Sequence, residues 1–566
     1  MLLSKVSALH RACLSKRFLA TLRGEGLVEC VPNFSEGRDP VVIEKIADAA
    51  RGVSGVTLLD VDPGASTNRT VYTLVGSPKA AVEGALAMAK VAEGLIDMKA
   101  HSGEHPRFGA MDVCPFVPVR GTTMTDCVDC AHEFGRRAGE ELGIPVYLYG
   151  EAAAAVNSGD HRRLLPQVRE GEYEAIEDRI KETKWKPDFG PAEFIPSWGA
   201  TAAGARKFLI AYNINLLGTK EQATRIARNI REDGRGPNEP GRLPGVKGIG
   251  WDVDEYGLAQ ISVNITDHEK TPMHVVFEEV KKDAAELGLS VVGSEVVGLI
   301  PLSALLDAAS FYEKKEGAFV VSERQKVILA CERLGLNSVA SFDPSQRVVE
   351  YMTKDEGAEP LASLSVRDFV EILGARTAAP GGGSAAALHA SCGAALGAMM
   401  GWMSFGSKKW ESIDGDMRAS IKPLHEAMMD LIPMIDADTN AFNDYMEAMR
   451  LPKETDEEKR KRDAAMQAGL KVAIDVPLNV MRVANQVWPA MQVCAELGNL
   501  SSKSDLQVGA RSLELGIWSA LKNVEINMGD ITDEDYKTKT LHEAQSIHRN
   551  AEKCCSQVLQ TLDNRS

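Results

Sequence analysis

A change of pattern near residue 360 most constrains what this chain can fold into. Between residues 27 and 340, short runs rich in β-branched residues alternate with helical periodicity, which predicts a layered α/β structure. After the linker at 355–360 no segment has the pattern of a strand, and residues 364–566 are helical apart from turns. The chain is therefore multidomain, with an N-terminal α/β part followed by an all-α helix-bundle domain.

The α/β part repeats one order of elements. Residues 27–149 predict strand, helix, two strands, helix and strand, with one further helix and strand at the end. Residues 207–300 repeat the βαββαβ order, with a hairpin over 246–265. This order predicts two related, ferredoxin-like α/β sandwich subdomains, with the cleft between them as the default site. The predicted boundaries are a leader at 1–26, subdomains at 27–208 and 209–353, a linker at 354–361 and a helical domain at 362–566.

Composition narrows the classes of function. The 566 residues are 44% hydrophobic and 25% charged, as in soluble globular proteins, and no run of 18 apolar residues predicts a membrane span. The formal net charge of -16 argues against a nucleic-acid partner, which needs a basic footprint. Cys127 and Cys130 form one CxxC pair without a second pair at zinc spacing, so we interpret them as part of a helix face.

The first 24 residues differ from the rest. They contain five basic residues, three serines and no acid before Glu25, which is the composition of a mitochondrial presequence. A disordered leader explains the same composition equally well.

The loop from His101 to Arg107 is the first candidate site. Two histidines, Glu104 and Arg107 lie within seven residues, and Gly103 and Pro106 exclude a helix or strand there. Histidine can accept or donate a proton near neutral pH. The alternative is a solvated loop with hydrogen-bonded histidines, and local chemistry does not separate the two histidines from each other.

The helical part contains a second candidate. An apolar stripe from Leu424 to Met449 predicts one long helix, in which Asp438 occupies a core position. A buried carboxylate has a raised pKa and can serve as an acid or base, unless Arg482 or a helix terminus satisfies it. Residues 380–384 (Pro-Gly-Gly-Gly-Ser) precede a small-residue helix, and their amides either bind an anion or carbonyl or merely start the helix flexibly.

Motifs throughout the chain resemble a known family. The resemblance rests on residues 27–37, 66–72, 103–107, 196–201, 205–210, 379–384, 436–438 and 504–508. These motifs are similar to those of the formimidoyltransferase-cyclodeaminases, bifunctional folate enzymes of histidine degradation. The resemblance covers residue 27 to the C-terminus.

The resemblance implies two reactions. A transferase moves the formimino group from N-formimino-L-glutamate to N5 of tetrahydrofolate, giving glutamate and 5-formiminotetrahydrofolate. A cyclodeaminase then forms 5,10-methenyltetrahydrofolate and releases ammonia. The implied co-substrate is polyglutamated tetrahydrofolate, with no metal, and the implied assembly is a homo-octamer in which helical domains pair.

The resemblance also implies site residues. The transferase base is His105, which Asp62 in the polar turn at 62–69 orients or assists, and the cyclodeaminase catalytic residue is Asp438. Phe194 and Trp198 suit a pterin ring, and Lys207 or Lys503 suits the folate carboxylates. The folate-binding positions are Gly190, Pro191, Ala192, Glu193, Phe194, Ile195, Pro196, Ser197, Trp198, Gly199 and Gly241.

A role in interactions is the alternative from another class. Animal relatives associate with the Golgi or centrosome and with cytoskeletal filaments, although nothing in this sequence encodes that association. The resemblance implies a cytoplasmic location, and residues 1–24 supply the mitochondrial alternative. Residues 152–161 are slightly longer than in mammalian relatives, and no motif includes them.

Overall fold

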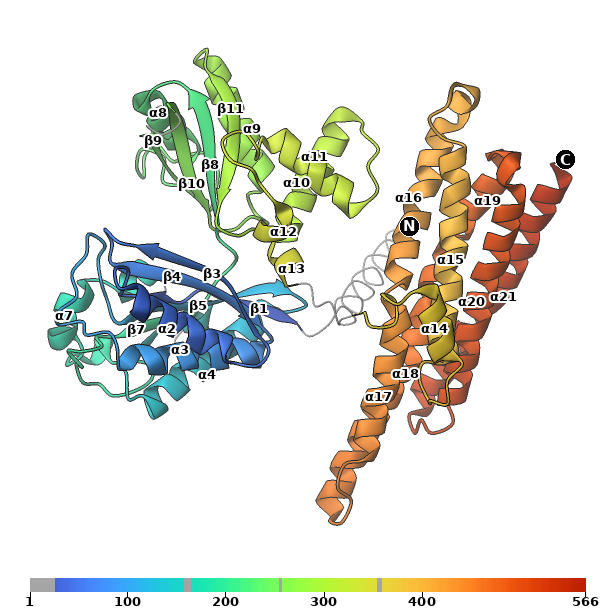
Figure 1. The fold of residues 1–566 in the computed structure, drawn as a ribbon, viewed down its shortest axis with the longest axis horizontal. Helices are drawn as coiled ribbons and strands as arrows, with labels where there is room; N and C mark the ends of the chain where they lie inside the picture. Colours follow the sequence, from blue (N-terminus) through green and yellow to red (C-terminus); the bar gives the residue numbers. More distant parts are fainter. Residues whose placement is uncertain (1–25, 157–163, 254–256, 354–358, 566) are drawn as a thin grey trace. The chain divides into compact units, whose positions relative to one another are not determined.

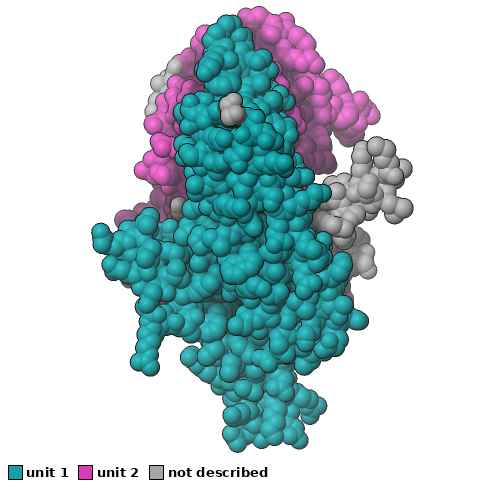
Figure 2. Space-filling view, turned by 90° about the vertical axis from the view of Figure 1, so that its right-hand side faces the viewer, with its two compact units in different colours: residues 1–24, 355–566 teal, residues 25–354 magenta. Residues whose placement is uncertain are grey.

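The computed structural model describes residues 26–156, 164–253, 257–353 and 359–565 (Figure 1). The predicted presequence and most of the predicted linker lie outside the described residues. The chain divides into an α/β unit over residues 25–354 and a helical unit that contains residues 355–566 (Figure 2). The prediction of an α/β part followed by a helical domain is therefore confirmed.

The first sheet of the α/β unit holds seven strands within the described residues, in the order β1-β4-β2-β5-β7-β6, with β3 paired to β4. The strands are β1 (Leu27–Cys30), β2 (Asn33–Phe34), β3 (Val56–Gly64), β4 (Arg69–Gly76), β5 (Met111–Arg120), β6 (Val146–Gly150) and β7 (Thr201–Ala205). Only the β5–β7 and β6–β7 pairs are parallel. Helices α2 (Pro40–Arg51), α3 (Pro78–Glu93) and α4 (Met124–Glu141) pack on one face of this sheet (Figure 1).

Two details of this sheet differ from the sequence pattern. The run predicted as one strand from residue 27 to residue 34 is divided at Pro32, which cannot donate to a ladder. Strand β7 replaces the irregular connection that the sequence predicts before residue 207. Its Ala and Gly residues have low strand propensity, and burial between β5 and β6 places them in the sheet.

The remaining elements after β6 are short. They are α5 (Glu151–Val156), α6 (Leu165–Val168), α7 (Glu172–Arg179) and a 3₁₀ turn, η1 (Thr183–Trp185). Helix α4 carries Cys127 and Cys130, and both thiols are buried in the core. Burial raises the pKa of both thiols, so the interpretation of the CxxC pair as a helix face is confirmed.

The second sheet has the predicted βαββαβ order. Its antiparallel strands follow the order β11-β8-β10-β9 and are β8 (Ile210–Leu217), β9 (Val246–Val253), β10 (Leu258–Ile265) and β11 (Ser290–Val297). Helices α8 (Lys220–Ile230) and α9 (Met273–Glu286) cover one face of it, and the other carries the hydrogen-bonded Asn215 and Gln260. Four helices complete this part: α10 (Leu302–Glu316), α11 (Glu323–Leu334), α12 (Pro344–Arg347) and α13 (Val349–Met352).

Apolar contacts join the two sheets into one unit. Val75 of β4 and Val117 of β5 belong to the same core cluster as Phe208 and Val348 of the second subdomain. Glu29 pairs with both valines in register and is buried between them. Burial raises the pKa of Glu29 to about 7 against the opposing charge of Arg206.

The helical unit is a bundle. Its helices are α14 (Val366–Leu373), α15 (Gly382–Met403), α16 (Asp414–Leu431), α17 (Met434–Met449), α18 (Asp456–Gln486), α19 (Trp488–Leu497), α20 (Lys503–Asn527) and α21 (Glu534–Asn564), with 3₁₀ turns η2 (Lys408–Ile413) and η3 (Leu500–Ser502). The single helix predicted across residues 424–449 is wrong, because the chain breaks at Pro433, which lacks an N–H, and α17 starts anew. Among the described residues no helix is long and apolar enough to span a membrane.

Glycines allow α15 and α20 to approach closely at the centre of this bundle. A Cβ added at Gly393 would lie 2.6 Å from the backbone nitrogen of Leu513. A Cβ added at Gly516 would lie 2.6 Å from the nitrogen of Ala390. Because backbone atoms on both sides set these distances, a side chain there requires the helices to move apart.

We expect Gly393→Val to lower the free energy of local opening of α15 and α20 by about 3 kcal/mol through overpacking. Native-state hydrogen exchange on the full chain measures this change. Gly415→Ala in α16 is the matched control, since nothing lies within 4 Å of its added Cβ, and it should be neutral or stabilising by up to about 1 kcal/mol. Unchanged exchange in the valine variant would contradict the close crossing.

Candidate active sites

The loop from His101 to Arg107 follows α3 and leads into β5. Asn68, at a positive φ of 52°, holds it from the side of β4. The Asn68 side-chain amide donates to the Ser102 carbonyl at 3.1 Å, and its oxygen accepts from the Gly37 N–H at 3.0 Å. Gly103 packs on the Thr67 backbone, where an added Cβ would lie 2.1 Å from the Thr67 carbonyl oxygen. The loop is therefore fixed at its start by neighbouring backbone.

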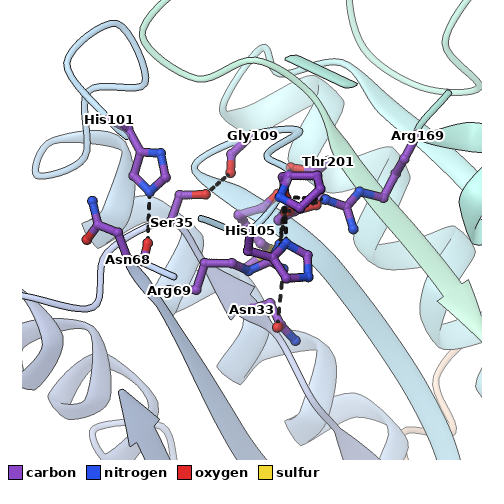
Figure 3. A network of polar contacts seen from close by, with 12 residues as sticks. Asn33, Ser35, Asn68, Arg69, His101, His105, Gly109, Arg169 and Thr201 are labelled. Atoms are coloured by element: carbon purple, nitrogen blue, oxygen red, sulfur yellow. Dashed lines mark hydrogen bonds and ion pairs between the residues drawn. The ribbon is translucent and has the colours of Figure 1, made fainter. Parts of the chain in front are cut away.

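The two histidines of this loop have different environments. His101 is buried, its Nε2–H donates to the Asn68 carbonyl at 2.8 Å, and burial lowers its pKa, so it is a neutral structural side chain. His105 is exposed, with its Nδ1 turned toward the protein (Figure 3). The structure thus separates two histidines that the sequence pattern could not.

An ion-paired cluster lies directly under His105. Arg69 at the start of β4 bonds Asp112 of β5 at 2.5 Å, and Arg169 after α6 reaches the same carboxylate oxygen at 3.1 Å. The Arg69 side chain is 8% exposed and that of Asp112 is fully buried. Burial raises the pKa of Asp112, and the two guanidinium groups oppose that rise. Arg69 Nη1 lies 2.9 Å from His105 Nδ1, and its Nη2 donates to Asn33 at 3.3 Å (Figure 3).

The proposed folate-binding segment, residues 190–199, borders the His105 loop. The Met98 N–H donates to the Ser197 carbonyl at 2.9 Å, and the Ala110 N–H donates to the Trp198 carbonyl at 2.7 Å. Trp198 is only 2% exposed and its indole N–H donates to Thr201 at 3.0 Å. The expectation that Trp198 meets a pterin ring is therefore wrong for this conformation, because its ring is core. Phe194 is half-buried beside Tyr173 and keeps that capacity.

Other predicted positions lie apart from this loop. Gly241 belongs to the second subdomain, in the connection between α8 and β9, where its N–H donates to the Glu232 carbonyl at 3.2 Å. Asp62 lies in β3 rather than in a turn, since the strand continues to Gly64. Lys207 is paired with Asp267 and Glu269. Lys503 lies 3.5 Å from Asp563, so both lysines already have acidic partners.

Asp438 lies at the N-terminus of α15. Its carboxylate accepts the Ser384 backbone N–H and occupies the space a side chain at Gly383 would need, 1.9 Å from an added Cβ. Residues 382–384 of the glycine-rich segment thus form the first turn of α15, while Pro380 and Gly381 precede it. Burial raises the pKa of Asp438 to about 6, against the Ser384 bond, so this carboxyl changes charge near neutral pH.

Of the two partners predicted for Asp438, the structure shows the helix terminus. The other, Arg482, donates to Glu543 instead. The neighbouring Asp436 is 3% exposed and accepts the N–H groups of Leu361 at 2.7 Å and Ala362 at 3.0 Å. The predicted burial of the Asp438 carboxyl agrees with its raised pKa.

Sequence reasoning missed several neighbours of these sites. Arg69 belongs to the motif at 66–72 but had no role, and Asp112 and Arg169 showed no local signal. Asn523 of α20 was also missed, although its amide lies 3.4 Å from an added Cβ at Gly382, beside the start of α15. Only the fold brings these residues to the candidate sites.

Family models match both units. The model "Formiminotransferase domain, N-terminal subdomain" matches residues 27–206, "Formiminotransferase domain" matches 211–354, and "Formiminotransferase-cyclodeaminase" matches 365–546. A formimidoyltransferase-cyclodeaminase of Dictyostelium discoideum is 57% identical over 541 residues, which are 95% of this chain and 99% of that relative. The chain belongs to the formimidoyltransferase-cyclodeaminase family. The resemblance inferred from the motifs is thereby confirmed.

Shorter relatives of this formimidoyltransferase-cyclodeaminase chain match parts of it. A glutamate formimidoyltransferase of Thermoplasma acidophilum is 46% identical over 294 residues, which are 51% of this chain and 93% of that protein. A methenyltetrahydrofolate cyclohydrolase of Methylorubrum extorquens is 33% identical over 201 residues, which are 36% of this chain and 97% of that protein.

The raised pKa of Asp438 predicts the direction in which the stability of the helical unit changes with pH. The pKa of Asp438 is about 6 in the folded chain, against an ordinary value of 3.8. The protonated carboxyl therefore contributes its full stability below pH 3.8, and this contribution is lost as the pH rises through 6. We expect Asp438→Asn to stabilise the helical unit at pH 8 by about 2 kcal/mol, and to have little effect at pH 4. Native-state hydrogen exchange at both pH values measures the difference.

Asp436→Asn is the control for this prediction. An amide oxygen replaces the two carboxylate oxygens poorly at Leu361 and Ala362, so this variant should destabilise the unit by about 1 to 3 kcal/mol. Equal effects of the two substitutions at pH 8 would refute the different environments assigned to them.

Proposed function

We propose that the chain is a bifunctional folate enzyme with one site in each unit. The α/β unit transfers the formimino group of N-formimino-L-glutamate to N5 of tetrahydrofolate, releasing glutamate. The helical unit converts 5-formiminotetrahydrofolate to 5,10-methenyltetrahydrofolate and ammonia. Identity of 57% to a formimidoyltransferase-cyclodeaminase over 95% of the chain carries this assignment.

His105 is the proposed base of the transfer. As N5 bonds to the formimino carbon, the Nε2 of His105 takes the N5 proton, and it returns a proton to the glutamate nitrogen as that nitrogen leaves. The exposed ring and the inward-facing Nδ1 support this role, since they leave Nε2 on the open side. The proton that the ring gains in the first step is the one that it loses in the second.

The loop at 190–199 is the proposed folate contact of this site. Phe194 offers an aromatic surface, and Ser197 and Glu193 are exposed beside it. The backbone bonds of Ser197 and Trp198 to the ends of the His105 loop support a shared site. Gly241 stays a predicted contact from the second subdomain.

Asp438 is the proposed proton carrier of the ring closure. The formimino group enters in its protonated CH=NH₂⁺ form, so that bonding of N10 to its carbon leaves an amino group there. The carboxylate takes the N10 proton and gives it to this amino group, which leaves as ammonia with the bonding electrons and gives the cationic methenyl product. A pKa of about 6 supports this exchange, since both charge states are accessible near neutral pH. The amides at the start of α15 and the Asn523 side chain supply polar groups around the reacting carbon.

Other parts of the assignment rest on the resemblance and stay predictions. They are the place in histidine degradation, the polyglutamated form of the folate, the cytoplasmic or mitochondrial location, and any association with the Golgi, centrosome or cytoskeletal filaments.

The two-site proposal predicts reciprocal losses. We expect His105→Ala to reduce formimino transfer about a thousandfold while ring closure of supplied 5-formiminotetrahydrofolate continues, because proton transfer is lost only in the first reaction. Asp438→Ala should show the reverse. Methenyl-folate absorbance and ammonia release measure the two steps. If either variant, folded and assembled like the parent, lost both activities, the assignment of separate sites would be wrong.

We also propose a homo-oligomer in which helical units of two copies pair. Exposed apolar side chains follow α20 at Val508, Leu515, Trp518 and Ile526, the last 77% exposed. Val508 and Leu515, with Leu559 of α21, line a hollow of about 340 Å³. An apolar stripe of this length is typical of a surface that another chain covers. The octameric state is the predicted full assembly.

We expect Trp518→Glu to weaken this pairing about thirtyfold, since a charge replaces an aromatic contact. Analytical ultracentrifugation across protein concentrations measures the change. Val41→Glu places the same charge on an exposed apolar position of α2 and should leave the assembly intact. Equal dissociation by the two variants, or by neither, would count against the α20 interface.

A further inference from the structure

Donors and acceptors are crowded around Nδ1 of His105. The Pro106 carbonyl oxygen lies 2.7 Å from His105 Nδ1, 2.7 Å from Arg169 Nη2 and 3.2 Å from Arg69 Nη1. Arg69 Nη1 is itself 2.9 Å from Nδ1 and 2.5 Å from Asp112. One guanidinium nitrogen therefore faces the Asp112 carboxylate, the Pro106 carbonyl and the His105 imidazole at once.

The protons in this cluster define the states of the ring. A carbonyl only accepts, so the Pro106 contact needs a proton on Nδ1, which leaves Nε2 with a lone pair on the open side. A guanidinium only donates, so a hydrogen bond from Arg69 needs Nδ1 without its proton. Both neutral tautomers thus find a partner. The imidazolium, in contrast, places a positive ring beside the Arg69 charge.

The charged groups beneath the His105 ring are mostly positive. Arg69, Asp112 and Arg169 together carry one net positive charge beneath His105, and the next acidic group that acts on Asp112 is Glu172. The cluster is also incompletely satisfied, because the buried Asp112 Oδ1 and Arg169 Nε have no hydrogen-bond partner among the described residues.

We propose that Arg69 is a positioning residue for His105. Anchored by Asp112 and Asn33, it holds the imidazole with Nε2 toward the substrate. Arg169 fixes the Pro106 carbonyl that receives the Nδ1 proton. This inference rests on the proposed role of His105 as the transferase base.

Arg69→Met and Arg69→Lys separate the charge from the geometry. The methionine variant should lower kcat of formimino transfer about tenfold to a hundredfold. It should leave KM within about twofold of the parent, because the imidazole is misplaced while the substrate contacts stay. The lysine variant keeps the charge but cannot span three acceptors, so kcat should fall about tenfold, again with KM little changed.

Carbethoxylation by diethylpyrocarbonate gives a readout that does not depend on turnover. This reagent acylates unprotonated, accessible imidazole nitrogens, and fragment-ion spectra of the tryptic peptide 100–107 distinguish His105 from His101. His105 in the methionine variant should be acylated faster than in the parent at the same pH, because its ring has lost a partner that holds it. The buried His101 should stay protected, which reports that the loop remains folded.

The outcomes are decisive in both directions. An unchanged kcat in the methionine variant with His101 protected overturns the inference. If that variant exposes His101, the lysine variant decides: a kcat within twofold of the parent overturns the inference, and a tenfold fall with His101 protected supports it. Arg136→Met, at an exposed position of α4, is the control and should change neither readout.

His105→Ala, measured in parallel, tests the underlying function separately. If that variant transfers the formimino group normally, the role of His105 itself is wrong. If it is inactive while the Arg69 variants behave like the parent, only the positioning role fails.

Discussion

The buried ion pair between Arg69 and Asp112 connects the central strands of the first sheet. It reaches from β4 across the two-residue strand β2 to β5, and Asn33 of β2 accepts from the same guanidinium. Removing one partner of a buried pair commonly costs about 3 to 5 kcal/mol, because the other charge stays behind. The strand order β4-β2-β5 is thus coupled to the position of the loop that carries His105.

The two candidate groups have different surroundings. His105 stands on an exposed loop, with the Arg69 guanidinium 2.9 Å from its Nδ1. Asp438 is held between burial, which raises its pKa, and the Ser384 N–H, which lowers it.

The sequence pattern predicted those elements whose local propensity agrees with their place in the fold. The hairpin of β9 and β10, the α4 helix and the change to an all-helical unit follow from periodicity. Strand β7 did not, because Ala202 and Gly204 favour a sheet only when β5 and β6 surround them. Pro433 was passed over because the stripe on either side of it kept its spacing. Motifs identified His105, but the Arg169 contact spans 57 or more residues and has no local sequence signal.

Gly383 shows what an unreactive position contributes to a reactive site. Its missing side chain is the space that the Asp438 carboxylate fills at the start of α15. Even a methyl group there would displace the carboxylate from its present position beside the Ser384 N–H. On the proposed role of Asp438, a natural substitution at residue 383 would therefore impair the second reaction although it alters no functional group.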